Sequence, residues 1–275
     1  MLAGIPATTR VLEVDGLATT VVELGDGPPL VLLHGGIECG GVMWAPVLAQ
    51  LALANHVVVP DVPGLGESAP APDLDVDTFA RWIHGVVLQT GLDRPTLVAH
   101  SLVGSLAARF AARGTDLISR LVLYGAPGVG PYRMPVHLRY VAVRSAIRPT
   151  PRNAERFERF ALLDVDATRQ RDRGWYDAFR AYTRARARVP HVKRTMRSLV
   201  ATQTKSIGDG ELDRIALPTT LLWGRRDRMV PLSVGQAAAA RHRWPLHVID
   251  DAAHAPHIEQ PEAFVGTLTA VGAAV

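Results

Sequence analysis

Three residue types that together perform nucleophilic catalysis occur at separated points of the chain. Ser101 lies in LVAHSLVG after a short apolar run, Asp227 follows the run LLWG, and His254 follows the run LHVI. A serine hydroxyl is a poor nucleophile unless a histidine takes its proton and an acid orients that histidine. We therefore predict Ser101 as a nucleophile, His254 as its base and Asp227 as the acid.

The position of Ser101 has two interpretations when it is considered alone. If the run LVA is a buried strand and LVGSLAARFAAR an amphipathic helix, Ser101 stands on the turn between them. A serine at such a turn either caps the helix or exposes its hydroxyl as a nucleophile. The order Ser, Asp, His, with each residue just beyond an apolar run, favours the nucleophile. Asp250 and Asp251 are alternative acids, but they share one short segment with His254.

A glycine-rich stretch supplies what the developing oxyanion of an acyl transfer would need. LLHGGIECGG follows a further apolar run, and its glycines let the backbone approach a substrate carbonyl. The amide of Gly36 is expected to act together with the amide of Leu102, the residue after Ser101. His34 at the start of this loop is expected to hold the loop in place rather than to transfer protons.

The elements that must position these residues are predicted from short β-branched or leucine-rich runs. Two of the runs flank Asp15-Gly16, a dipeptide typical of a hairpin. The later runs alternate with amphipathic helical stretches, which indicates a parallel sheet with helices on both faces. The eight runs are RVLEV, ATTVVEL, PLVLLH, HVVVPD, PTLVAH, RLVLYG, PTTLLWG and LHVID. We predict an α/β fold with a mostly parallel eight-stranded sheet and an antiparallel N-terminal hairpin, and in such sheets ligands bind at the carboxyl ends of the strands.

The pattern changes once along the chain. From Pro127 to Asp213 the sequence is helical in period, rich in arginine and without strand-like runs. Residues 1–126 and 214–275 are therefore predicted to form one α/β core, interrupted by an all-helical insertion over 127–213.

Composition limits the classes of function. The 275 residues are 48% hydrophobic and 20% charged, no apolar run approaches the length of a membrane span, and the N-terminus lacks a signal-peptide pattern. Cys39 is the only cysteine, which suits a reducing compartment. The net charge of +4 comes without a nucleic-acid-binding motif. We expect a cytoplasmic protein that acts on a small molecule, with no cofactor, no metal and neither nucleic acid nor membrane as partner; a homodimer is left open.

Several blocks of the sequence resemble one known superfamily in their order. HGG with Trp44 further on, PDVPGLGES, AHSLVG, LLWGRRDRMVP and AAHAPHIEQPEAF are similar to successive blocks of the α/β-hydrolases. The resemblance implies a catalytic triad of Ser101, Asp227 and His254, with the amides of Gly36 and Leu102 as the oxyanion hole. It further implies that the insertion is a cap over the substrate pocket. The cap residues that are candidates to line this pocket are Trp175, Tyr176 and Phe179.

Two departures from the family pattern bear on function. Family members usually have small residues two places before and after the nucleophile; Ala99 fits, whereas Val103 does not. We expect Gly104 or Ala99 to make the room that lets the turn form. Parts of the sequence also resemble carbon-carbon bond hydrolases, which usually follow the catalytic histidine with tryptophan where this chain has Ala255.

The expected function is that of a serine hydrolase acting on a small carboxylic ester or lactone, because a serine rather than an aspartate occupies the elbow. A carbon-carbon bond hydrolase of ring-fission-type diketo acids, using the same triad, is one alternative. A ligand-binding member without turnover is another.

Overall fold

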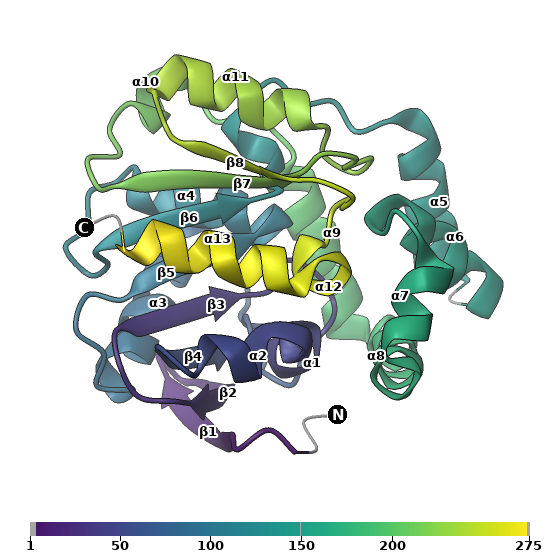
Figure 1. The fold of residues 1–275 in the computed structure, drawn as a ribbon, viewed down its shortest axis with the longest axis horizontal. Helices are drawn as coiled ribbons and strands as arrows, with labels where there is room; N and C mark the ends of the chain where they lie inside the picture. Colours follow the sequence, from purple (N-terminus) through teal and green to yellow (C-terminus); the bar gives the residue numbers. More distant parts are fainter. Residues whose placement is uncertain (1–3, 149, 274–275) are drawn as a thin grey trace.

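The computed structural model describes residues 4–148 and 150–273, and a single mixed sheet runs through it (Figure 1). The sheet has eight strands, as the sequence predicts, and they lie in the order β1-β2-β4-β3-β5-β6-β7-β8. The strands are β1 (Thr8–Val14), β2 (Leu17–Leu24), β3 (Pro29–Leu33), β4 (His56–Pro60), β5 (Thr96–His100), β6 (Arg120–Tyr124), β7 (Thr219–Gly224) and β8 (Leu246–Ile249).

The hairpin predicted at Asp15-Gly16 joins β1 to β2. Both turn residues adopt positive φ angles, 50° for Asp15 and 74° for Gly16, and such a turn matches the twist of paired strands. β2 is also antiparallel to β4, whereas the pairings from β4 through β3 and β5 to β8 are parallel. The carboxyl ends of these parallel strands therefore meet at one edge of the sheet.

Helices cover both faces of the sheet because adjacent strand residues point to opposite sides. Leu97 belongs to one buried cluster and Val98 to the other. The first cluster also holds residues of α3 (Val76–Gln89), α4 (Ser101–Ala111) and α11 (Leu232–His242). The second holds residues of α2 (Ala45–Leu51) and α13 (Pro261–Ala273). The short α1 (Gly40–Met43) precedes α2, and the short α12 (Pro256–Glu259) precedes α13. In Figure 1, α2 and α13 lie in front of the sheet, and α3 and α4 lie behind it.

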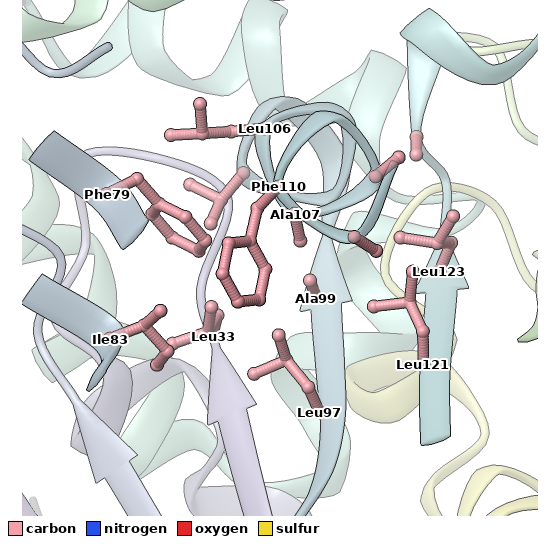
Figure 2. Packing of buried hydrophobic residues seen from close by; sticks show 14 of the residues in the cluster. Leu33, Phe79, Ile83, Leu97, Ala99, Leu106, Ala107, Phe110, Leu121 and Leu123 are labelled. Carbon is pink, nitrogen blue, oxygen red and sulfur yellow. The ribbon is translucent and has the colours of Figure 1, made fainter. Parts of the chain in front are cut away.

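The packing under α4 fixes the strand-to-helix turn that carries Ser101. Figure 2 shows Leu97 and Ala99 of β5 facing the helix, with Ala107 and Phe110 above them. All four are buried, and Leu97 and Ala99 have no exposed surface. Burying a leucine or phenylalanine side chain contributes about 1.5–3 kcal/mol, so these contacts hold β5 and α4 in a fixed relation.

The segment between β6 and β7 is helical, as expected from the sequence, and much of it lies to one side of the sheet (Figure 1). It begins with a 3₁₀ turn over Pro127–Val129 and continues through α5 (Val136–Ile147), α6 (Pro151–Ala161), α7 (Val165–Arg171), α8 (Arg173–Arg186), α9 (Pro190–Gln203) and α10 (Asp209–Leu212). Val192 and Leu199 of α9 join the core cluster, so α9 packs on the α/β core beside α4. Within the described ranges, no helix is both long and apolar enough to cross a membrane.

Candidate active site

The turn after β5 holds Ser101 in an unusual backbone conformation. β5 ends at His100, α4 begins at Ser101, and Ser101 itself has a φ angle of +53°. A positive φ is uncommon for a residue with a side chain, and it is the strained geometry that exposes a nucleophile on a strand-to-helix turn. Ser101 therefore adopts the conformation expected of a nucleophile and not that of an ordinary helix cap.

The three residues selected from the sequence form one hydrogen-bonded chain. Ser101 Oγ lies 2.9 Å from His254 Nε2, and His254 Nδ1 lies 2.7 Å from Asp227 Oδ2. All three residues are buried, with 4–8% of their surface exposed. With Nδ1 donating to the carboxylate, Nε2 is free to accept the serine proton.

Asp227 is held so that only one of its oxygens faces the histidine. It follows β7, and its Oδ1 accepts hydrogen bonds of 2.8 Å from the amides of Met229 and Val230. These bonds fix the carboxylate and leave Oδ2 for His254. The alternative acid Asp250 instead forms a surface ion pair with Arg225.

The backbone of His254 is fixed at both of its polar groups. Its amide donates to the carbonyl of Ala161 in the helical insertion at 2.9 Å, and its carbonyl lies 3.1 Å from His100 Nε2. His100 stacks on Tyr124, and burial together with the nearby histidines holds its pKa well below the ordinary value. A neutral His100 thus positions the histidine loop and does not exchange protons.

The glycine-rich loop after β3 lies directly against Ser101. A Cβ added at Gly35 would stand 2.5 Å from the His100 carbonyl oxygen and 2.6 Å from Ser101 Cβ, so only glycine fits there. His34 pins the loop, as expected, since its Nε2 accepts from the Val62 amide and its Nδ1 lies 3.1 Å from the Gly36 carbonyl oxygen. Burial lowers the pKa of His34 to about 4, which keeps the ring neutral.

The same loop brings a carboxyl group to the predicted oxyanion hole. A Cβ at Gly36 would stand 2.5 Å from Glu38 Oε2, so the Glu38 carboxyl lies against this glycine. Burial raises the pKa of Glu38, while the bonds from its own amide and from Gly36, and the charge of His254, oppose that rise. The sequence analysis missed this residue, although a glutamate within a glycine-rich loop is itself a signal.

The elbow accommodates Val103 in the way expected from the sequence. Val103 is fully buried in the core, whereas a Cβ added at Gly104 would meet the Ala99 carbonyl oxygen at 2.8 Å and Ala126 Cβ at 3.0 Å. The close approach between α4 and the strands therefore occurs at Gly104. Leu102 begins the first turn of α4 beside Ser101, where helix amides have no partner within the helix.

The three cap residues proposed to line the pocket have different surroundings. The indole of Trp175 donates to the Val42 carbonyl at 2.9 Å and stacks on Phe179. Tyr176 is fully buried, and its hydroxyl donates to Glu158, so it supports the inside of the cap. Phe179 is half-buried. Trp175 thus links the cap to α1, directly after the glycine-rich loop.

Two residues that the sequence analysis missed connect the cap to the loops that carry Asp227 and His254. The Glu259 carboxyl accepts hydrogen bonds from the amide of Leu163 in the cap and, at 2.7 Å, from the amide of Ala253. The Arg228 side chain, next to Asp227, donates to the carbonyls of Arg159 and Leu163. Burial raises the pKa of Glu259 to about 7. No pattern in a single sequence distinguishes these residues from surface charges.

The remaining candidates around the site are structural. Asp61, at the end of β4, accepts from the amides of Gly40 and Glu67, and burial raises its pKa to about 7. Burial and the nearby Asp61 raise the pKa of the Cys39 thiol to about 12, which disfavours the nucleophilic thiolate form. In the described part of the chain, no group of three or more histidine, cysteine, aspartate or glutamate residues could hold a metal ion.

Comparison with known proteins is consistent with this geometry. A family model described as the alpha/beta hydrolase fold matches residues 28–261. The chain is 30% identical, over 86% of its length and 83% of the relative, to a 2-hydroxy-6-oxononadienedioate/2-hydroxy-6-oxononatrienedioate hydrolase of Paraburkholderia phymatum. It is 27% identical to the protein of the same name from Klebsiella pneumoniae, covering 94% of this chain and 93% of that one.

The fold is also similar to that of solved structures. A carboxylesterase from Bacillus subtilis superposes with a TM-score of 0.83, at 20% identity, over 100% of this chain and 94% of the other. At this identity the similarity shows a common fold and leaves the substrate open.

Proposed function

Because this chain belongs to the α/β-hydrolase family, we propose that it is a serine hydrolase that cleaves a small carboxylic ester or lactone through an acyl-enzyme on Ser101. The observation that carries the proposal is the hydrogen-bonded chain from Ser101 through His254 to Asp227 at a strained turn. A merely structural serine would not need a buried imidazole and a buried carboxylate aligned behind it.

The proposed reaction has two halves. In the first, Ser101 Oγ attacks the substrate carbonyl carbon while His254 Nε2 takes the hydroxyl proton, and the amides of Gly36 and Leu102 donate to the developing oxyanion. His254 then gives the proton to the leaving alcohol oxygen as its bond to carbon breaks. In the second, water attacks the acyl-enzyme, with His254 as base, and releases the acid and free Ser101. Asp227 stabilises the imidazolium in both halves.

Glu38 favours a neutral ester over an acidic substrate. Its carboxyl lies against Gly36, so a substrate oxygen that binds the Gly36 amide has to come close to this carboxyl. A substrate that brings its own carboxylate would place a second negative charge beside Glu38 in a site largely shielded from water, where like charges repel strongly. A neutral carbonyl brings no such charge.

The second candidate is a carbon-carbon bond hydrolase acting on a diketo acid. The two relatives favour it, since both are 2-hydroxy-6-oxononadienedioate/2-hydroxy-6-oxononatrienedioate hydrolases. Ala255 in the place of tryptophan and the carboxyl of Glu38 favour the ester instead.

Two measurements test the proposal. Ser101→Ala should lower kcat toward p-nitrophenyl acetate by several orders of magnitude with an unchanged circular dichroism spectrum, and retained turnover would remove Ser101 from the mechanism. The ratio of kcat/KM for this ester to that for a ring-fission diketo acid separates the two candidates. A preference for the diketo acid of more than about tenfold would contradict the ester.

Glu38→Gln provides the matched variant for the substrate class. It keeps the size of the side chain and removes the charge, so kcat/KM for the diketo acid should rise relative to that for the ester. An unchanged ratio would show that Glu38 does not select against acidic substrates.

A further inference from the structure

Helix α5 of the cap presents an unusual apolar surface to solvent. Among the described residues, seven large hydrophobic side chains are exposed, and four of them belong to this one helix. They are Val136 (74% exposed), Tyr140 (55%), Val143 (51%) and Ile147 (69%), which we call the α5 stripe. Their spacing of three or four residues places them on one face of the helix.

The opposite face of α5 already has its partner. Leu138 and Val141 are buried, and His137 packs edge-on against Phe160 of α6. The helix is therefore apolar on two faces, one seated on the cap and one exposed. Figure 1 places α5 and α6 at the margin of the molecule, away from the sheet. A single exposed apolar residue needs no explanation, but a continuous stripe of four marks an interaction surface.

Charge identifies the kind of partner. Arg139 flanks the α5 stripe on one side, and Arg144 and Arg148 on the other; all three are exposed. Arg144 packs over the Tyr140 ring and donates to its hydroxyl, and within the described ranges no carboxylate lies within ion-pair distance of any of the three. The whole insertion is basic, because residues 127–213 contain 18 lysines and arginines against 9 aspartates and glutamates, whereas the rest of the chain contains 12 against 17.

We propose that the α5 stripe docks the cap onto an anionic lipid surface. A helix with an apolar face bordered by arginines lies in the plane of a bilayer interface, with its apolar side chains among the acyl chains and its cations at the phosphates. The acidic core would then face away from the membrane. A second copy of this chain is a poorer occupant, because two α5 helices packed face to face would bring their arginines together.

This inference differs from the expectation of no membrane partner. That expectation came from the lack of a spanning run, and a stripe along one helix face produces no such run. The docking is independent of the proposed reaction, although it would bring the cap to esters dissolved in the lipid.

The test is cosedimentation of the full chain with vesicles. We expect the protein to bind vesicles of equimolar phosphatidylcholine and phosphatidylglycerol, and to bind pure phosphatidylcholine at least tenfold more weakly. Val143→Ser with Ile147→Ser should weaken binding to the anionic vesicles at least tenfold, with kcat toward p-nitrophenyl acetate within twofold of the parent. The matched control is Leu53→Ser with Leu88→Ser, which removes two exposed apolar side chains from the core surface and should leave binding unchanged.

Three results would overturn the proposal. One is no binding to anionic vesicles, and another is equal binding by the Val143→Ser, Ile147→Ser variant. The third is a parent protein that is dimeric by light scattering and becomes monomeric in that variant, which would assign the stripe to a second copy.

Discussion

Replacing Gly35 by alanine crowds the oxyanion loop against the turn after β5, where the new Cβ would also stand 2.6 Å from Ser101 Cβ. The new Cβ would stand 2.5 Å from the His100 carbonyl oxygen and 2.9 Å from the His100 carbonyl carbon. Both are backbone atoms at the end of β5, next to a residue with a φ angle of +53°, so they cannot move aside cheaply. The glycine-rich loop has to move instead, and the Gly36 amide moves with it.

The expected magnitudes follow from these contacts. Overpacking of this kind costs about 1–3 kcal/mol of the free energy of unfolding. Removal of one oxyanion donor lowers kcat by about 10²–10³-fold. A donor that is displaced rather than removed should cause a large part of the same decrease in kcat. We therefore expect Gly35→Ala to lower kcat toward p-nitrophenyl acetate at least tenfold and to lower the urea midpoint.

Gly36→Ala is the comparison variant, since the three atoms nearest to its Cβ belong to the flexible Glu38 carboxyl, and it should destabilise the fold less. Urea unfolding measures the loss of stability in both variants, and steady-state kinetics measure the loss of kcat. A Gly35→Ala protein with the parent kcat and urea midpoint would refute the close approach of the loop to the elbow.

Four further predictions concern single side chains and pH. Asp227→Asn should lower kcat about 10³–10⁴-fold, because an asparagine amide facing His254 Nδ1 favours the tautomer in which Nε2 already carries a proton and cannot accept one from Ser101. A loss of kcat below tenfold in steady-state assays would argue against Asp227 as the acid. Val103→Gly should lower the free energy of unfolding by about 2–3 kcal/mol, measured in urea, because a fully buried valine is lost and a glycine enters a helix. We expect little change in kcat. A folded variant without activity would instead show that Val103 helps to position Leu102. Gly266→Ala, in α13 with nothing within 4 Å of the new Cβ, should raise the free energy of unfolding by about 0.5–1 kcal/mol, and a lower thermal midpoint would contradict this. Burial raises the folded-state pKa values of Glu259 and Asp61 from their ordinary 4.5 and 3.8 to about 7, so between about pH 4 and pH 7 the folded chain binds more protons than the unfolded chain. The free energy of unfolding should therefore fall as the pH rises toward 7. Urea midpoints that rise over this pH range would contradict the prediction.

The sequence predicts the sheet and the meeting of Ser101, Asp227 and His254 because both depend on local patterns. Each strand is a short apolar run, and Ser101, Asp227 and His254 each follow one, so strand ends bring them to one edge of the sheet. The sequence also indicates how the turn tolerates Val103, since the neighbouring Gly104 allows α4 to approach the strands closely.

Other features depend on side-chain directions that no run of residues encodes. Tyr176 and Trp175 are adjacent on α8, yet one is buried inside the cap and the other bonds to the α1 carbonyl of Val42. Glu259 and Glu38 differ from surface glutamates only through the amides that three-dimensional packing brings to them. The cost of Val103→Gly likewise follows from its complete burial, which is known only from the fold.

The central claim is that Ser101 is an activated nucleophile, and covalent labelling tests it most directly. Intact mass and peptide mapping after treatment with a fluorophosphonate should find one phosphonyl group, on Ser101. Labelling should be abolished in Ser101→Ala and slowed at least a hundredfold in His254→Ala, because the base that takes the serine proton is missing. A folded parent protein that remains unlabelled, or one labelled at another residue, would contradict the account.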